Sequence, residues 1–383
     1  MLNPIPSKLP QAGLSIFAKM TALAQQYQAI NLAQGFPDFA PPEQLFQFLN
    51  EAVESGFNQY APMPGLLMLR QQIASRLENR YQLKANIDDD ITVTAGATQA
   101  IYTIISAFIR PGDKVLIFEP AYDSYGPAVL VNGVSQFTSD SNYQIFSIPW
   151  TQLESMLQKG KIRMILINNP HNPAGRILHQ EDMLRFEKLA VQYDVLWVWD
   201  EVYDMLVFDS KPHWSALHYP EIMKSSIVTF SMGKTLHNTG WKIGYTIAKA
   251  ELTKEIRKVH QFLVFSVNTP AQYAIAKFME SYPEFINELP QFYQHKRDFF
   301  FKEMKHPDFE WLPCEGSYFA LARFKNPEQL SDAVFAEQLV ANKKVATIPI
   351  SAFYHDGYDP GIVRFCFAKK EDTIKEAATQ LLK

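Results

Sequence analysis

Two lysines lie close together in an apolar, glycine-rich stretch of the chain. The segment "SMGKTLHNTGWKIGY" (231–245) places Lys234 directly after Gly233 and Lys242 eight residues later. A lysine in apolar, partly cationic surroundings has a lowered pKa, which suits a nucleophile or a base. The segment supports two interpretations: a nucleotide-phosphate loop built on "GKT", or a lysine that reacts with the carbonyl group of a cofactor.

The letters around the "GKT" tripeptide argue against a nucleotide site. A P-loop requires a glycine five residues before its Gly-Lys pair, and that position is Val228. The segment "VLWVWDE" (195–201) resembles a Walker B strand, but it precedes "GKT" instead of following it. We therefore favour the second interpretation.

A pyridoxal phosphate site accounts for more of the sequence. This cofactor needs an amine that can react with its aldehyde, a carboxylate that keeps its pyridine nitrogen protonated, and donors for its phosphate. Lys234 supplies the amine and Asp200 the carboxylate. The segment Gly96-Ala97-Thr98 opens a helical pattern and forms an anion site, which Ser231 and Lys242 would complete.

These groups follow short apolar runs, each rich in β-branched or aromatic residues. The runs are "ITVT" (91–94), "VLIF" (115–118), "MILIN" (164–168), "VLWVW" (195–199), "SIVTF" (226–230) and "YTIA" (245–248). Strands that are apolar on both faces indicate a sheet covered on both sides. Helical patterns at 100–109 and 182–193 lie between the runs and indicate βαβ units with a mostly parallel sheet.

The predicted fold is α/β, with a large domain at 40–280. Residues 281–383 mix helical stretches with short strands, and we expect them to form a smaller α+β domain together with an N-terminal arm, 1–39. Ligands of open α/β sheets bind beyond the carboxyl ends of the strands. We therefore expect one edge of the sheet to gather the residues that follow the runs, which include Thr98, Tyr122, Asn172, Asp200, Glu201, Tyr203, Ser231 and Lys234.

The composition excludes several classes of partner. The 383 residues carry a net charge of −4, so nothing directs the chain to nucleic acid or an anionic membrane. The uncharged run 91–109 contains too many polar residues for a membrane span and fits a strand, a turn and a helix. The prolines of the first 13 residues stand where a signal peptide needs an apolar run. Two cysteines indicate no disulfide framework, and we predict a reducing, cytoplasmic location.

Eight motifs in a fixed order carry a resemblance that spans nearly the whole chain. They are "QGFPDF" (34–39), "NQYAPMPG" (58–65), "TAGATQA" (94–100), "NNPHNPAG" (168–175), "DEVY" (200–203), "SMGKT" (231–235), "GWKIGY" (240–245) and "VRFCFAKK" (363–370). With them the chain resembles the class I aminotransferases of pyridoxal phosphate fold type I. "SVNTPAQ" (266–272) and "LPCEGSYF" (312–319) resemble the branch that contains methionine and kynurenine–glutamine aminotransferases.

The resemblance implies a role for each matching residue. Lys234 would bind the cofactor covalently and then move the proton of the substrate α-carbon, while Asp200 would pair with the pyridinium nitrogen. Tyr122 would stack on the ring, and Asn172 and Tyr203 would bond its phenolic oxygen. Arg364 and Gly35 would hold the substrate α-carboxylate, and the phosphate would lie among Gly96, Ala97, Thr98, Ser231, Lys242 and Tyr60 of the neighbouring subunit in a homodimer. No metal site is expected.

The implied activity moves an α-amino group from methionine, aromatic amino acids, glutamine or kynurenine to a 2-oxo acid by a ping-pong mechanism. The chain has Tyr122 and Lys242 where aspartate-specific relatives have tryptophan and arginine, and no arginine stands out for a second substrate carboxylate. One alternative is β-elimination from cysteine S-conjugates on the same site. Another is a cofactor-binding regulator, which would need a DNA-binding segment for which no residues are left over.

Each residue also has a structural explanation that involves no chemistry. Asp200 could bond a turn, Arg364 could form an ordinary salt bridge, Tyr122 could be core, and Asn172 and His171 could shape a turn. Cys314 and Cys366 are most simply buried apolar residues. The functional interpretation rests on the joint order of the motifs, because five strand ends supply five complementary groups.

Overall fold

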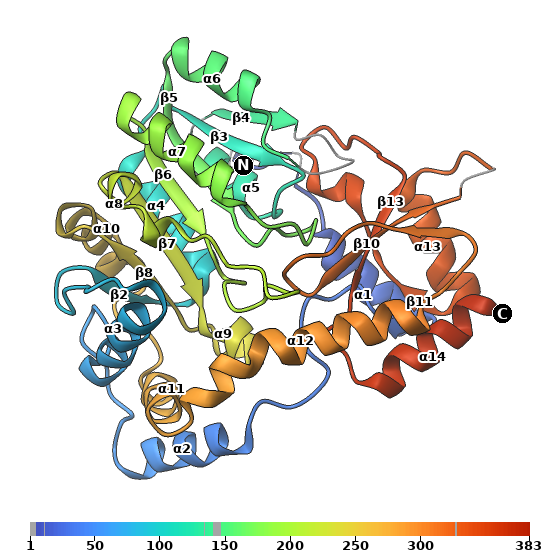
Figure 1. The fold of residues 1–383 in the computed structure, drawn as a ribbon, viewed down its shortest axis with the longest axis horizontal. Helices are drawn as coiled ribbons and strands as arrows, with labels where there is room; N and C mark the ends of the chain where they lie inside the picture. Colours follow the sequence, from blue (N-terminus) through green and yellow to red (C-terminus); the bar gives the residue numbers. More distant parts are fainter. Residues whose placement is uncertain (1–4, 11, 134, 141–146, 326–327) are drawn as a thin grey trace.

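The computed structural model describes residues 5–10, 12–133, 135–140, 147–325 and 328–383, and of 135–140 only the backbone. Its larger sheet has seven strands in the order β2-β8-β7-β6-β5-β3-β4 (Figure 1). The strands are β2 (Ile91–Thr94), β3 (Lys114–Glu119), β4 (Ser135–Asp140), β5 (Ile162–Asn168), β6 (Leu196–Asp200), β7 (Ser226–Ser231) and β8 (Gly244–Ala248).

The six apolar runs all form strands of this sheet, within one or two residues of the expected bounds. The sheet is mostly parallel, as predicted, but β8 runs antiparallel to both of its neighbours, β2 and β7. The edge strand β4 was not predicted, because "SQFTSD" is polar and lacks the apolar run that marks the inner strands.

Helices cover both faces of the sheet, and alternate strand residues face opposite layers. On β6, Leu196 and Val198 belong to one apolar cluster, with α4 (Gly96–Phe108), α5 (Tyr125–Val131) and α10 (Ala250–Leu263). Trp197 and Trp199 belong to the other, with α3 (Leu67–Tyr81), α6 (Trp150–Gln158) and α7 (Gln180–Gln192). Two short elements, α8 (Pro220–Met223) and α9 (Met232–Thr235), flank β7 in the chain.

A second, antiparallel sheet lies to the right in Figure 1 and has the order β12-β13-β10-β9. Its strands are β9 (Phe309–Trp311), β10 (Phe319–Phe324), β12 (Ile348–Pro349) and β13 (Ile362–Cys366). The helices near it are α12 (Pro283–Glu303), α13 (Asp332–Lys343) and α14 (Glu371–Leu382), while α2 (Glu43–Glu54) packs on α11 (Thr269–Ser281) below the larger sheet.

The N-terminal segment is built into this second region. Helix α1 (Ile16–Gln26) contacts α13, and β1 (Ile30–Asn31) pairs in parallel with β11 (Val345–Ala346). The chain start also reaches the larger sheet, because the Nζ of Lys8 donates to the carbonyl of Val131 on α5. The domain boundaries at 40 and 280 stay a prediction.

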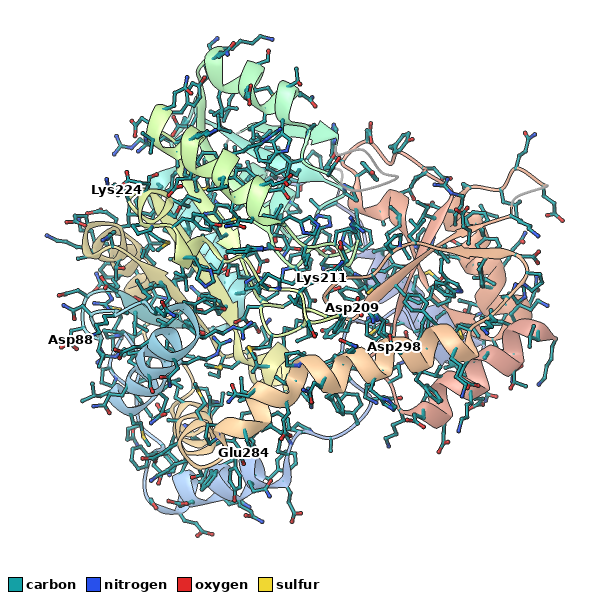
Figure 2. All side chains as sticks on the ribbon, viewed as in Figure 1. Asp88, Asp209, Lys211, Lys224, Glu284 and Asp298 are labelled. Carbon is teal, nitrogen blue, oxygen red and sulfur yellow. The ribbon has the colours of Figure 1, made fainter. Side chains whose placement is uncertain are left out.

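Charged contacts join the loop after β6 to the second region, where Figure 2 labels Asp209, Lys211 and Asp298 close together. Arg297 of α12 donates to Asp209 at 2.6 Å and forms an ion pair with Asp298 at 2.8 Å. The Nζ of Lys211 lies 2.7 Å from a carboxylate oxygen of Glu315. These contacts fix the loop that continues from the end of β6 against the residues that precede β10.

Candidate active site

A cavity of about 220 Å³ opens at the carboxyl edge of the larger sheet. It gathers every site residue that the sequence predicts within one chain: Gly35, Gly96, Ala97, Thr98, Tyr122, Asn172, Asp200, Tyr203, Ser231, Lys234, Lys242 and Arg364. Tyr60 does not line it. The Tyr60 side chain is 79% exposed and contacts the ring of Phe265.

The start of α4 forms one wall of the cavity. The residue before this helix, Ala95, has no side chain that could cap the first N–H groups, which makes this end suitable for an anion. Gly96 has a φ of +80°, and a Cβ there would lie 3.4 Å from the Nζ of Lys242. The ammonium of Lys242 therefore lies beside the helix start, as a phosphate site requires.

Lys242 reaches this wall because β8 runs antiparallel to its neighbours. The strand begins at Gly244, which pairs with the last residue of β2, Thr94, and with the last residue of β7, Ser231. A Cβ at Gly244 would come within 2.6 Å of the Phe230 carbonyl oxygen. A glycine is therefore needed where β8 passes between β7 and α4.

Lys234 lies on α9, directly after β7, and points into the cavity. Its Nζ donates to the hydroxyl of Tyr318 at 2.8 Å and to the carbonyl of Gly35 at 3.3 Å. Burial lowers the pKa of Lys234 to about 8, and the positive charges of Lys242 and Arg364 act in the same direction. An amine with this pKa is largely protonated at neutral pH yet gives up its proton readily.

Asp200 is the last residue of β6, and its carboxylate is almost fully buried. The Tyr125 hydroxyl donates to its Oδ2 at 2.5 Å. Burial raises the pKa of Asp200 to about 6, while the hydrogen bond from Tyr125 and the charge of Lys234 oppose this shift. The carboxylate is therefore mostly ionised at neutral pH and suited to pair with a buried cation.

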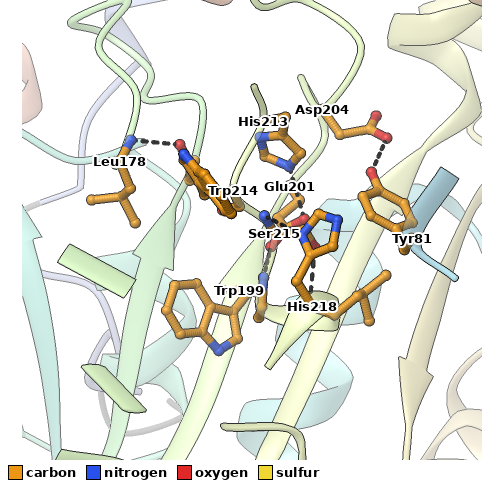
Figure 3. A network of polar contacts seen from close by, with 12 residues as sticks. Tyr81, Leu178, Trp199, Glu201, Asp204, His213, Trp214, Ser215 and His218 are labelled. Atoms are coloured by element: carbon orange, nitrogen blue, oxygen red, sulfur yellow. Dashed lines mark hydrogen bonds and ion pairs between the residues drawn. The ribbon is translucent and has the colours of Figure 1, made fainter. Parts of the chain in front are cut away.

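The residues of "DEVYD" (200–204) point in two directions. Asp200 and Tyr203 face the cavity, whereas Glu201 and Asp204 face a buried network (Figure 3). Glu201 accepts from the Ala216 N–H at 2.9 Å and lies 3.0 Å from Nε2 of His213. Glu201 follows β6 at the expected edge of the sheet, but its carboxylate does not line the cavity, because it is used to hold the segment in place.

Asp204 anchors the other end of this segment. Its carboxylate accepts from the Tyr81 hydroxyl at 2.6 Å and pairs with Arg76 of α3. The neighbouring positive charges lower the pKa of Asp204, although burial alone would raise it. Glu201 and Asp204 are thus both hydrogen-bonded on the side away from the cavity. These bonds anchor the backbone that carries Asp200 and Tyr203.

Arg364 on β13 forms the opposite wall and is 1% exposed. Its Nη1 donates to Oδ1 of Asn172 at 2.7 Å and its Nη2 to the Ala33 carbonyl at 3.2 Å. Within the described residues, its Nε has no hydrogen-bond partner and the side chain forms no ion pair. The structure thus does not use Arg364 as an ordinary salt bridge, and a carboxylate ligand would fit it.

Gly35 lies beside Arg364, and its backbone approaches the opposite wall closely. A Cβ at this position would lie 2.8 Å from the ring of Phe319. The guanidinium of Arg364 is stacked 3.8 Å from the centre of the same ring. Because Gly35 has no side chain, the ring of Phe319 has the space to stack against the guanidinium of Arg364.

Sequence reasoning missed some residues at this site. Tyr125 and Tyr318 bond to the two central ionisable groups, and Phe17 and Phe319 line the cavity beside Arg364. "LPCEGSYF" indicates a branch of the family but does not single out Tyr318, and no letter pattern distinguishes Tyr125 from a core tyrosine. Tyr122 lines the cavity as expected, and its hydroxyl lies 3.4 Å from that of Thr98.

His171 and the cysteines keep their structural explanations. His171 bonds across the turn to Arg176 and Gly175, and burial lowers its pKa to about 4. It is not among the residues that line the cavity. Cys314 and Cys366 are buried free thiols. Among the helices that the structure describes, none has both the length and the apolar character of a membrane span.

Comparison with known proteins agrees with this geometry. Residues 27–381 match the family model of aminotransferase class I and II. The chain is 43% identical to the methionine aminotransferase of Escherichia coli, over 99% of this chain and 98% of that protein. It is 30% identical to a kynurenine–oxoglutarate transaminase of Dictyostelium discoideum, over 99% and 96%.

Solved structures show the same similarity. A structure from Escherichia coli described as a methionine aminotransferase superposes with a TM-score of 0.95 and 43% identity, over 99% of both chains. An N-succinyldiaminopimelate aminotransferase from Mycobacterium tuberculosis superposes with a TM-score of 0.92 and 32% identity, again over 99% of both. The relatives are transaminases, so the comparisons favour amino-group transfer over β-elimination. The chain belongs to the class I and II aminotransferase family.

Proposed function

We propose that the cavity binds pyridoxal phosphate and transfers the α-amino group of a neutral amino acid to a 2-oxo acid. The observation that carries this proposal is the convergence in one cavity of the Lys234 amine, the Asp200 carboxylate, the α4 start with Lys242, and the unpaired Arg364 guanidinium. The buried Nε of Arg364 and the uncapped start of α4 both fit anionic groups. Enzymes of this family generally depend on this cofactor.

Each residue has a role that its position supports. Lys242, Ser231 and residues 96–98 would hold the phosphate, and Asp200 would pair with the ring nitrogen. Tyr122 would lie against the ring, and Asn172 and Tyr203 would bond its phenolic oxygen. Bound pyridoxal phosphate would supply an electron-withdrawing ring, which stabilises the negative charge left when the substrate α-carbon loses its proton.

The residues of the chain provide the positioning and the proton transfer. Arg364 and Gly35 would bind the α-carboxylate, and the planar guanidinium would fix its orientation through two parallel hydrogen bonds. Lys234 would take the α-proton and return it at the end of the half-reaction, since an amine with a pKa of about 8 can do both near neutral pH. The aromatic walls would exclude water from the reacting atoms.

The lining favours neutral substrate side chains. Among the described residues around the cavity, the cations are Lys234, Lys242 and Arg364, and the proposed roles use all three. A second substrate carboxylate would find no further cation there. We therefore propose methionine, aromatic amino acids, glutamine or kynurenine as donors, which agrees with the names of the first two relatives.

A panel of amino donors against several 2-oxo acids tests this proposal, scored by kcat/KM. Methionine and phenylalanine should exceed aspartate and glutamate by at least about tenfold. A preference for a dicarboxylic donor, such as the substrate of the mycobacterial relative, would contradict the assignment of the side-chain pocket. Release of pyruvate and ammonia from a cysteine conjugate without an acceptor would instead support the lyase.

We also propose a homodimer in which Tyr60 reaches the phosphate of the neighbouring site. Tyr60 cannot serve its own cavity in this conformation, because it does not line it. Phe265, whose ring contacts that of Tyr60, is 57% exposed, and Phe262, three residues before it, is 88% exposed. A second copy of the chain would cover them. The free thiols support the predicted cytoplasmic location.

A further inference from the structure

Tyr318 contacts the amine on which the reaction depends. Its side chain is fully buried, and its oxygen accepts from the Nζ of Lys234 at 2.8 Å. The same hydroxyl donates to the carbonyl of Gly35 at 2.5 Å, and this carbonyl also accepts from Nζ, at 3.3 Å. The amine therefore donates to two oxygens, those of Tyr318 and Gly35, which are also joined by a hydrogen bond.

The surroundings fix the orientation of this hydroxyl. Burial raises the pKa of Tyr318 well above its usual value, so the hydroxyl stays protonated and donates to Gly35. The hydroxyl also hydrogen-bonds the side chain of Tyr203, and its oxygen accepts from the amine. The ring contacts Tyr203 at 5.1 Å and Phe319 at 4.9 Å, both edge-on, and the Tyr318 carbonyl accepts from the Phe367 N–H at 3.0 Å.

We propose that Tyr318 is a positioning residue for Lys234: its hydroxyl, with the Gly35 carbonyl, holds the amine whenever the amine is not bonded to the cofactor. In that state the amine acts on the substrate. The α-carbon–hydrogen bond breaks, an N–H bond forms on Lys234, and the electron pair stays with the substrate. The new ammonium then donates to Tyr318 and Gly35 until it returns the proton.

The hydroxyl also affects how readily the amine is protonated. An oxygen that accepts from Nζ stabilises the ammonium more than the neutral amine. Burial lowers the pKa of Lys234. The hydrogen bonds from its Nζ to the two oxygens favour the ammonium and so act against this shift. Removal of the Tyr318 hydroxyl should therefore lower the pKa of Lys234 further and leave the amine less well oriented.

Tyr318→Phe tests the proposal, and Tyr293→Phe is its matched control. Tyr293 is equally buried and its ring lies 5.9 Å from that of Tyr318, but its hydroxyl has no hydrogen-bond partner among the described residues. Both substitutions remove one buried hydroxyl and keep the ring. A substitution of Tyr318 by 3-fluorotyrosine retains the shape and weakens the acceptor, which covers the case that Y318F does not fold.

Two measurements are needed. In the full-length protein without added cofactor, peptide-resolved acylation of Lys234 across a pH series gives the pH at which the amine becomes half reactive. We expect this pH to fall by about half a unit or more in Y318F and to stay unchanged in Y293F. In the loaded enzyme, we expect Y318F to lower kcat about tenfold with KM within about twofold.

The outcomes separate this proposal from the function on which it rests. Equal effects of Y318F and Y293F, or no change of the labelling pH in either Y318F or the fluorotyrosine protein, would overturn the role of Tyr318. Turnover that survives Lys234→Ala would instead overturn the proposed role of the lysine. The labelling result does not depend on turnover, so the two failures are distinguishable.

Discussion

At the scale of single residues, the central feature is the buried carboxylate of Asp200, whose charged form is favoured by the hydroxyl of Tyr125, the N–H of Val202 and the charge of Lys234. Asp200 is buried, and burial favours its neutral form, yet pairing with a ring cation requires the charged form. The hydrogen bond from Tyr125 favours the charged form. Tyr125 therefore contributes to the site through Asp200, although its own hydroxyl is turned toward the carboxylate and not toward a substrate.

We predict that Tyr125→Phe raises the pKa of Asp200 by about one unit, since a hydrogen bond to a charged group contributes more than 1 kcal/mol. Asp200 has a raised pKa of about 6, so its charged form is lost as the pH falls through 6. The acid limb of the kcat/KM profile should move to higher pH in Y125F. Tyr219→Phe is the control, because the buried Tyr219 hydroxyl has no described partner, and this variant should keep the wild-type profile.

Sequence reasoning identified the residues that line the cavity but not those that adjust them. Local sequence motifs identify four of the lining residues, because each of them follows or lies on a strand at a fixed position: Lys234, Asp200, Asn172 and Arg364. Tyr125 and Tyr318 act through contacts between segments 75 and 84 residues apart. Their letters are also those of ordinary core tyrosines, so only the folded arrangement reveals them.

At the scale of elements, the direction of β8 determines the phosphate side of the site. If β8 ran parallel to β7, Lys242 would lie at the far edge of the sheet. The antiparallel course brings Lys242 and Gly244 next to the start of α4. The apolar run at 245–248 predicted the strand. Its apolar residues would look the same in a parallel and in an antiparallel strand, so the sequence could not predict that β8 runs antiparallel. The edge strand β4 was not predicted because its polar sequence contains no apolar run.

We predict that Gly244→Ala weakens cofactor binding at least about tenfold and lowers the free energy of unfolding by about 2 kcal/mol. The new methyl group would meet the Phe230 carbonyl at 2.6 Å and the Ala97 nitrogen at 3.0 Å, which pushes β8 away from α4. Urea unfolding and cofactor titration would measure both effects. Gly240→Ala, where nothing lies within 4 Å of the added atom, should match the wild type in both, and an equal loss in this variant would contradict the packing argument.

At the scale of the whole molecule, the cavity gathers residues from both sheets and from the N-terminal segment. Gly35, Lys234 and Arg364 come from parts of the chain that are far apart in sequence. The predicted dimer would add Tyr60 from a second copy. Domain boundaries and assembly are the features that are hardest to predict from sequence. They depend on contacts between surfaces, and the sequence of one chain does not show which surfaces meet.

Mixed dimers test the assembly. We predict that Tyr60→Ala protein, which binds the cofactor too weakly to be active at limiting pyridoxal phosphate, and inactive Lys234→Ala protein recover activity under that condition when their subunits exchange. One site of each mixed dimer would combine an intact Lys234 with Tyr60 of the other chain. Random exchange should restore about one quarter of the wild-type activity, because half of the dimers would hold one complete site of two. No recovery, with exchange verified by mass spectrometry, would show that Tyr60 does not act across the interface.

The most direct test of the account is the turnover of Lys234→Ala beside that of Lys242→Ala, measured with saturating pyridoxal phosphate and the best donor of the panel. We predict that K234A loses about 10⁴-fold or more in kcat, because Lys234 is the proposed base for the α-proton. K242A should keep most of kcat and bind the cofactor about tenfold more weakly. Transamination by K234A at the wild-type rate would contradict the central claim.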